Sequence, residues 1–214
     1  MLSLAEGESG YDYRVCDTHC GFDTFYPEYF PPRFGFEEVS KQLQEFGMRI
    51  LPYINGRIFD IGTQSWTAND LIAQKSASKQ SESVINPTAQ NLSYWHESYG
   101  SLADFVIQCP YSEYWQDTIA DTVDKLVSFY GMDGVYIDQI ACAEAKPCYD
   151  PTHNHSIGGG NHFQVGNNKL LSAAQQKIGG NHIIMTEGQQ EYYIGGADVF
   201  LTLVGFDAGK PYFT

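Results

Sequence analysis

The ten residues YGMDGVYIDQ at positions 130–139 decide the fold class of this chain. Apolar residues recur at helical spacing up to Gly131, where a glycine can end the helix. Residues 134–137 are then small or apolar without interruption, and Asp138 follows them directly. A strand with no polar alternation is typical of a sheet that is covered on both faces. The segment therefore predicts a helix that leads into a buried strand, with a carboxylate at the carboxyl end of that strand.

The same unit of helix, glycine and short apolar strand recurs on both sides of this segment. Before it, Phe36, Val39, Leu43 and Phe46 lie on one helical face. The pattern predicts helices near residues 36–46, 115–130 and 170–178, and strands over residues 48–54, 134–137, 182–186 and 199–203, with residues 13–16 as a further candidate strand. Strands that alternate with helices indicate parallel βα units.

Two architectures fit such units, a (β/α)8 barrel and an open doubly wound sheet. No G-x-G-x-x-G motif follows a strand and no P-loop is present, which disfavours a nucleotide-binding open sheet. Acidic residues at the carboxyl ends of successive strands are typical of barrel enzymes. A full barrel takes about 250 residues. We therefore expect an α/β fold in which residues 1–214 form a single, truncated catalytic domain, a partial (β/α)8 TIM barrel with its catalytic face at the strand ends.

Charge and composition exclude several classes of partner. The 12 Lys and Arg residues against 26 Asp and Glu residues give a net charge of −14, which argues against binding to nucleic acid or to an anionic membrane surface. No stretch of 18 apolar residues predicts a transmembrane helix. No signal peptide is visible at the N-terminus, so exported and cytoplasmic locations both remain open. The 14% aromatic content suits a carbohydrate ligand, because aromatic faces pack on sugar rings.

The five cysteines are an odd number at irregular spacing, which is not typical of a disulfide framework in a chain of this length. We expect them to be free and buried. Two local groups resemble metal loops: Cys16, His19 and Cys20, and Cys142, Cys148, His153 and His155. Neither group has the ligand spacing of a zinc finger or zinc ribbon. The sequence thus predicts no metal site and no cofactor.

Two strand-end carboxylates are the candidate catalytic pair. Asp138 and Glu187 each close an apolar strand, and neighbouring parallel strands lie about 4.8 Å apart. Their carboxyl groups can therefore approach to about 5 Å, the separation of a retaining glycosidase. Asp138 could instead cap a helix or pair with a cation. Glu191, Asp198 and Glu144 are alternative acids to Glu187.

Further candidate residues follow the strands or lie in two long polar stretches, residues 61–101 and 141–163, expected as loops on the strand-end face. The residues expected to contact substrate are Tyr53, Asn55, Arg57, Asp60, Tyr136, Gln139, His153, His155, His162 and Glu191. Arg57 could keep Asp138 ionised. Asn55 could bind a sugar hydroxyl or simply form an Asn-Gly turn. The histidines could lie in a surface loop, and the tyrosines, like Tyr26 and Trp66, could belong to the core.

Several segments together resemble the DUF6259 family of glycosidase-like TIM barrels. They are residues 22–24, 26–31, 52–57, 109–111, 130–139, 150–153, 158–160 and 186–188. The resemblance runs in order over roughly residues 22 to 203. It implies a bacterial carbohydrate-active barrel, distantly similar to α-glycosidase superfamilies. Those enzymes use an aspartate at the end of strand four as nucleophile and a carboxylate from a later strand as acid/base, and Asp138 and Glu187 match these places.

The residues and the resemblance lead to one main hypothesis, retaining hydrolysis of an oligo- or polysaccharide by Asp138 and Glu187 without a cofactor. One alternative is a carbohydrate-binding barrel without catalysis, or an inactive fragment. It would gain if Glu187 faced the core or paired with Arg57. Another alternative is a metal-dependent hydrolase that uses Cys148, His153, His155 and Asp138.

Overall fold

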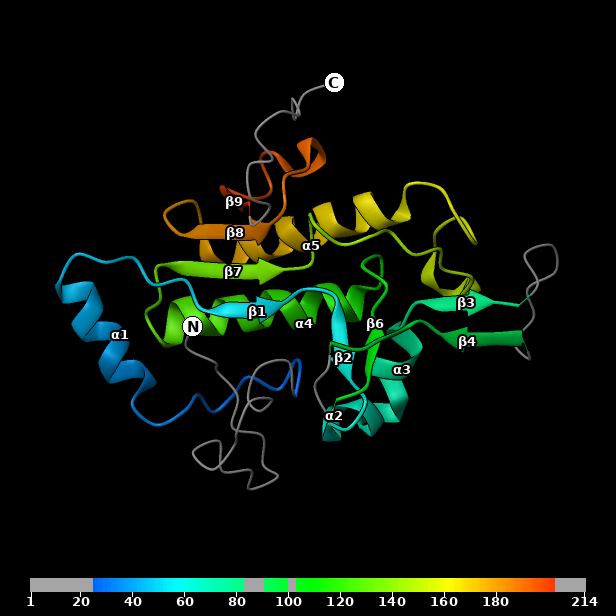
Figure 1. Ribbon diagram of the computed structural model, residues 1–214, viewed down its shortest axis with the longest axis horizontal. Coiled ribbons are helices and arrows are strands. Elements are labelled where there is room, and N and C mark those ends of the chain that lie inside the picture. The colour runs from blue at the N-terminus through cyan, green and yellow to red at the C-terminus, as the bar shows by residue number, and fades with distance from the viewer. Residues whose placement is uncertain (1–24, 83–90, 100–102, 203–214) are drawn as a thin grey trace.

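A four-stranded parallel sheet forms the centre of the molecule (Figure 1), whose computed structural model describes residues 25–82, 91–99 and 103–202. Its strands are β1 (Tyr53–Asn55), β7 (Gly134–Asp138), β8 (Ile183–Glu187) and β9 (Val199–Leu201), in the order β1-β7-β8-β9. All neighbours are parallel. The strands predicted after the second and third helices are confirmed, and within these ranges the sheet does not close into a complete barrel.

Two long helices, α4 (Glu113–Asp124) and α5 (His162–Ile178), pack against each other along one side of this sheet (Figure 1). A π-helical segment, Lys125–Phe129, extends α4. The apolar positions that predicted both helices are buried: Ile119, Val123, Leu126, Val127, Leu170, Leu171, Ala174 and Ile178. Gly166 lets α5 approach the segment after β6, because a Cβ there would stand 2.6 Å from the carbonyl carbon of Pro110. These helices cover the sheet face that Val135, Ile137 and Ile184 line.

Helix α1 (Phe36–Glu45) forms as predicted but turns a different face inward. Val39 and Phe46 are 41% and 82% exposed, whereas Phe36 and Ser40 are buried. The amide of Gln44 donates to the carbonyl of Gly131 at 2.9 Å. The predicted apolar face is therefore confirmed at Phe36 and wrong at Val39 and Phe46. Buried Ser40 and half-buried Gln44 continue an i, i+4, i+8 row from Phe36 to the turn after α4.

The first parallel strand is shorter than the predicted residues 48–54. The carboxylate of Asp133 accepts the Ile50 amide at 3.0 Å, where a strand would bond to its neighbour's backbone. Pro52 has no amide hydrogen, and only its carbonyl bonds to the Tyr136 amide, at 2.9 Å. Regular pairing therefore begins at Tyr53, in register with Tyr136.

A small subdomain stands between β1 and α4 where the sequence predicted a long loop over residues 61–101. Its elements are β2 (Ile58–Asp60), α2 (Gln64–Thr67), a 3-10 helix (Asn69–Leu71), α3 (Ile72–Ser76), β3 (Lys79–Ser81), β4 (Leu92–Tyr94), β5 (His96–Glu97) and β6 (Phe105–Ile107). Strands β2, β6 and β5 form one antiparallel sheet, and β3 and β4 another. The loop prediction is wrong for the described residues because strands of two or three residues are too short to show a period in a polar sequence.

The stretch between β7 and α5 is the long loop that was predicted, apart from one 3-10 turn, Pro151–His153. It lies against the small subdomain. The indole of Trp95 donates to the carbonyl of Pro147 at 2.7 Å, and the Tyr149 amide donates to that of Lys79 at 2.8 Å. Asp150 caps the turn by accepting the Thr152 amide at 2.9 Å. This loop is held in place by side chains and backbone contacts that are distant in the sequence.

The candidate strand at residues 13–16, the group of Cys16, His19 and Cys20, and the end of the predicted strand at Leu203 lie outside the described residues. Among the helices that the structure describes, none has the length and apolar character needed to cross a membrane.

Candidate active site

Asp138 and Glu187 end adjacent parallel strands and lie side by side. Strands β7 and β8 pair in register up to Ile137 and Thr186, so the next residue of each presents its carboxylate at the same edge. One oxygen of each carboxylate and the sulfur of Cys142 lie within 4.8 Å of one another. Gly188 permits this crowding, because its φ is +81° and a Cβ there would stand 2.8 Å from the Cα of Cys142. The pair has the proximity that the strand spacing predicted.

Each carboxylate accepts a hydrogen bond from a tyrosine of the preceding strand. Tyr53 of β1 donates to Asp138 at 2.7 Å, and Tyr136 of β7 donates to Glu187. The two rings meet edge to face with centroids 5.3 Å apart. Burial, together with neighbouring acidic groups, raises the pKa of both hydroxyls, so both remain protonated donors. Tyr53 and Tyr136 thus orient the two carboxylates, and their contact with substrate stays a prediction.

The environment of Asp138 shifts its protonation toward neutral pH. Burial and the nearby Glu187 carboxylate raise the pKa of Asp138 to about 6, against the opposing effect of hydrogen bonds from Tyr53 and the Gln139 amide. The Gln139 amide stands 2.6 Å from the carboxylate in a left-handed conformation, φ 61°. A residue other than glycine has a strained backbone at such a positive φ, and this strain is common next to functional groups. The side-chain amide of Asn55 donates to the side-chain oxygen of Gln139 at 2.9 Å.

Arg57 does not pair with Asp138 as the sequence led us to expect. Its buried guanidinium forms an ion pair with Glu97 at 2.7 Å and donates to the backbone carbonyl of Glu144 at 2.9 Å. The cation therefore ties the small subdomain to the loop after β7. Asp138 instead accepts hydrogen bonds from the Tyr53 hydroxyl, the Gln139 backbone amide and, at 3.8 Å, the Cys142 thiol.

The side chains of Asn55 and Asp60 are buried, and both accept hydrogen bonds from backbone amides. The side-chain oxygen of Asn55 accepts the amides of Arg57 and Ile58 at 2.9 and 3.0 Å, which is the Asn-Gly turn rather than an open hydroxyl-binding group. Asp60 accepts the amides of Phe25 and Gly62, each at 2.8 Å. Asn55 thus shapes the turn after β1, and Asp60 shapes the turn after β2.

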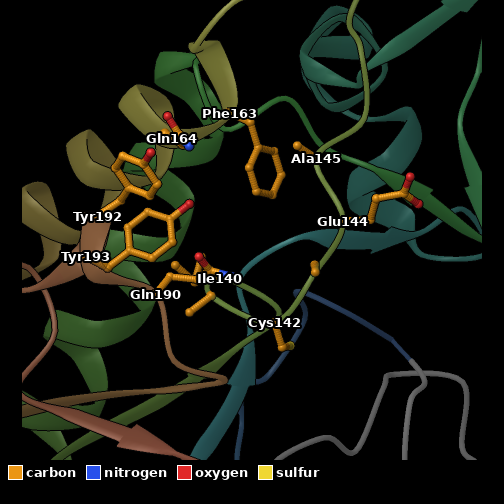
Figure 2. A pocket seen from close by; sticks show the side chains of 11 residues that line it. Ile140, Cys142, Glu144, Ala145, Phe163, Gln164, Gln190, Tyr192 and Tyr193 are labelled. Carbon is orange, nitrogen blue, oxygen red and sulfur yellow. The ribbon is translucent and has the colours of Figure 1, made fainter. Parts of the chain in front are cut away.

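A cavity of about 390 Å³ lies next to Cys142, whose sulfur is within 4.8 Å of both carboxylates, but neither Asp138 nor Glu187 lines it. It is lined by Ile140, Ala141, Cys142, Ala143, Glu144, Ala145, Phe163, Gln164, Gln190, Tyr192 and Tyr193. Figure 2 shows Phe163 of α5 and the rings of Tyr192 and Tyr193, from the 3-10 helix Glu191–Tyr193, reaching toward a common space with the Gln164 and Gln190 amides. Cavities of this size hold small ligands. The sequence did not predict these five lining residues, although a tyrosine pair just after a strand end was a signal.

The alternative acids are engaged elsewhere or face solvent. Glu191 is exposed and does not line the cavity. Asp198 accepts the Ile184 amide at 2.8 Å, at the strand ends opposite the carboxylate pair. The Glu144 carboxylate pairs with Lys146 at 2.5 Å. Glu187 is thus the acid whose carboxylate lies beside Asp138.

The predicted histidines gather away from the carboxylate pair. His153 and His155 lie with Cys109 and Cys148, while Cys142, which the sequence grouped with them, lies beside Asp138. The ring of His162 stacks on that of His155 with centroids 4.4 Å apart. Tyr26 and Trp66 belong to the hydrophobic core. Cys109 and Cys148 are free and buried as expected, but Cys142 is exposed.

Parallel strands with helices behind them and acidic residues at the strand ends define an α/β protein with a partial (β/α)8 barrel. A model of the family described as "Domain of unknown function (DUF6259)" matches residues 16–207, and the chain belongs to that family. It is 43% identical over 190 residues to "Putative glycoside hydrolase 22789" of Monosiga brevicollis, covering 87% of this chain and 15% of that protein. It is 33% identical over 183 residues to "Putative glycoside hydrolase" of Bacteroides thetaiotaomicron, covering 85% of this chain and 26% of that protein.

Solved structures of glycoside hydrolases share the fold at low sequence identity. The alpha-N-acetylgalactosaminidase NagBb of Bifidobacterium bifidum matches with a TM-score of 0.64 and 13% identity, covering 84% of this chain and 26% of that enzyme. The alpha-galactosidase TtGalA of Thermus thermophilus matches with a TM-score of 0.53 and 11% identity, covering 77% and 30%. The expected partial barrel is confirmed. The chain spans about a quarter or less of the curated relatives' length, and a bacterial source stays a prediction.

Proposed function

We propose that the protein hydrolyses a glycosidic bond of an oligo- or polysaccharide with retention of anomeric configuration. The observation that carries the proposal is the pair Asp138 and Glu187, which have one carboxylate oxygen each within 4.8 Å of the other and of the sulfur of Cys142, a residue that lines the cavity. Retaining glycosidases place their carboxyl groups about 5–5.5 Å apart, whereas inverting enzymes need about 6.5–9.5 Å to admit a water molecule.

In the first step Asp138 acts as nucleophile. Its carboxylate oxygen bonds to the anomeric carbon while the bond to the leaving oxygen breaks, and Glu187 gives that oxygen its proton. In the second step Glu187 takes a proton from water, the hydroxide attacks the anomeric carbon, and the bond to Asp138 breaks. The Tyr53 hydroxyl stabilises the ionised form of Asp138, and the Tyr136 hydroxyl stabilises Glu187 as a base.

The cavity supports a sugar as the ligand. Phe163, Tyr192 and Tyr193 offer apolar rings, and Gln164 and Gln190 offer amides that can both donate and accept hydrogen bonds. Sugar rings combine an apolar face with hydroxyl groups at the edge, which matches this lining. Because the structural relatives include enzymes named for α-galactose and α-N-acetylgalactosamine, α-linked galactosides are the first substrates to test.

The test uses aryl α-glycosides and α-glycosyl fluorides with this chain and with the full-length Bacteroides thetaiotaomicron relative. Asp138→Asn should lower kcat at least about 1,000-fold on every substrate. Glu187→Gln should lose activity on poor leaving groups but keep much of it on the fluoride, which departs without a proton. Glu191→Gln is the matched control and should behave as wild type. Full activity of Asp138→Asn, or NMR evidence for inversion, would contradict the proposal.

The second candidate function is carbohydrate binding without turnover, which is favoured by a cavity whose aromatic and amide lining includes neither Asp138 nor Glu187. Glu187 is half-buried and bonded to Tyr136, and Arg57 pairs with Glu97, so neither arrangement that this alternative required is present among the described residues. Calorimetric binding of a sugar by this chain, without product release by the full-length relative, would support it. A metal-dependent hydrolase receives no support, because Asp138 belongs to a different group from Cys148, His153 and His155.

A further inference from the structure

Four side chains with metal-binding atoms converge at a place distinct from the carboxylate pair. They are Cys109, which follows β6, and Cys148, His153 and His155 of the loop between β7 and α5. One sulfur or nitrogen atom of each lies within 4.8 Å of all the others. The cysteines and His153 are buried, and His155 is half-buried. The group brings two thiols and two imidazoles together in the interior.

The distances within the group match the edges of a tetrahedral site. The sulfur of Cys109 lies 3.3 Å from Nε2 of His155, and the sulfur of Cys148 lies 3.3 Å from Nδ1 of His153. Zinc binds sulfur at about 2.3 Å and imidazole nitrogen at about 2.0–2.1 Å, so tetrahedral angles place such ligands about 3.6 Å apart. The two observed distances lie within about 0.3 Å of that edge.

The outer nitrogens of both imidazoles fix which nitrogen faces the group. Nε2 of His153 lies 2.7 Å from the carbonyl of Lys75, and Nδ1 of His155 lies 2.9 Å from that of Ser156. A carbonyl only accepts, so each neutral ring holds its proton on the outer nitrogen and turns an unprotonated nitrogen inward. Metal-bound histidines are oriented by this same outer hydrogen bond.

We propose that Cys109, Cys148, His153 and His155 bind one Zn²⁺ as a closed structural site. Two sulfur and two imidazole ligands in a tetrahedral arrangement suit zinc among the common metals. All four positions are taken by protein, which is the pattern of structural rather than catalytic zinc. The catalytic pair contributes nothing to it, since Asp138 and Glu187 group with Cys142 instead.

The zinc fastens the loop that forms one wall of the cavity. Three ligands come from this loop, which has one 3-10 turn as its only helix, and the fourth follows β6 of the small subdomain. The bond from His153 to Lys75 adds α3 to the anchor. Cys142–Ala145 of the same loop line the cavity. The metal therefore holds a wall of the proposed sugar site without touching the reacting groups.

The test measures zinc by mass spectrometry of metals in the chain purified under reducing conditions with zinc present. We expect about one zinc per chain in wild type and at least a ten-fold loss in Cys109→Ser and Cys148→Ser. The matched control is Cys142→Ser, which changes a cysteine that lies beside Asp138 rather than among the four proposed ligands. This variant should keep the full zinc content.

Cobalt substitution keeps the proposal testable where a variant fails to fold. Wild-type protein that has been stripped of metal with a chelator and then given Co²⁺ should show the visible absorption bands of a tetrahedral site and the charge-transfer band of two thiolates. His155→Cys exchanges one ligand for another, so it should keep about one metal per chain and strengthen the thiolate band by about half. Less than about 0.1 zinc per wild-type chain, an octahedral cobalt spectrum, or a Cys109–Cys148 disulfide in place of metal would overturn the proposal.

Discussion

Replacing Asp138 by asparagine should stabilise the folded protein at neutral pH, although it removes the proposed nucleophile. The pKa of Asp138 is raised to about 6 from 3.8, chiefly by burial. The difference, 6 − 3.8 = 2.2, corresponds to about 3 kcal/mol. Because the folded state binds this proton more tightly than the unfolded chain, stability falls as the pH rises from about 4 to about 6, and the full cost remains above pH 6. Asparagine is neutral and escapes this cost.

The assay is denaturant unfolding of wild type and Asp138→Asn between pH 4 and pH 8. We expect the smallest gain at pH 4, where the folded aspartate is protonated and the unfolded one is about half ionised, and a gain that grows up to about pH 6 and then stays level. Its size above pH 6 should be about 1–3 kcal/mol, because the amide keeps only part of the hydrogen bonding.

Asp133→Asn is the matched control with the opposite sign. Burial tends to raise the pKa of Asp133, but hydrogen bonds from Gln44, the Ile50 amide and Arg49 outweigh it and lower the pKa. Asparagine here should therefore cost about 1–3 kcal/mol at neutral pH, a loss that fades as the pH falls through the lowered pKa. If both variants destabilise the protein alike at pH 7.5, the account of Asp138 is refuted.

Three further substitutions test other parts of the structure. Tyr53→Phe removes the hydrogen bond that favours ionised Asp138, so the acidic limb of the kcat/KM profile should move up by about one pH unit, and an unmoved limb would contradict this. Glu97→Ala leaves the buried Arg57 cation unpaired and should cost about 3–5 kcal/mol in denaturant unfolding, whereas a cost below about 1 kcal/mol would show that the pair is dispensable. Gly134→Ala would place a Cβ 2.1 Å from a backbone oxygen of β8 and should lower the free energy of unfolding by more than about 2 kcal/mol in the same assay. A smaller loss would show that β7 and β8 can move apart to admit the methyl group.

The main sheet was predictable because its strands are uninterrupted apolar runs and the helices before them have apolar residues at helical spacing. The apolar residues before Gly131 and at 134–137 indicate a helix and a strand from local sequence alone. The position of Asp138 at the end of that strand follows from the same pattern. The spacing of parallel strands then fixes how close Asp138 and Glu187 lie. These features depend on local sequence and on geometry common to all parallel sheets.

Other parts of the site were not predictable because distant contacts decide them. Arg57 was free to pair with Asp138 in sequence terms, but the subdomain places Glu97 against it. Three members of the group of thiols and imidazoles, Cys148, His153 and His155, were already grouped in the sequence, but Cys109 stands 148 − 109 = 39 residues before Cys148, so no short ligand motif includes it. Its composition is visible only when the loop folds back on β6.

The hydrogen bond from Tyr53 to Asp138 would let the ultraviolet absorption of Tyr53 report the chemical state of the Asp138 carboxylate. When Asp138 becomes an ester in the proposed glycosyl-enzyme, its oxygen is a weaker acceptor, and the Tyr53 phenol loses its charged partner. The near-ultraviolet absorption of a phenol responds to the loss of such a partner. A difference spectrum between wild type and Tyr53→Phe would then follow formation and decay of the covalent species in real time, with no label attached to the sugar.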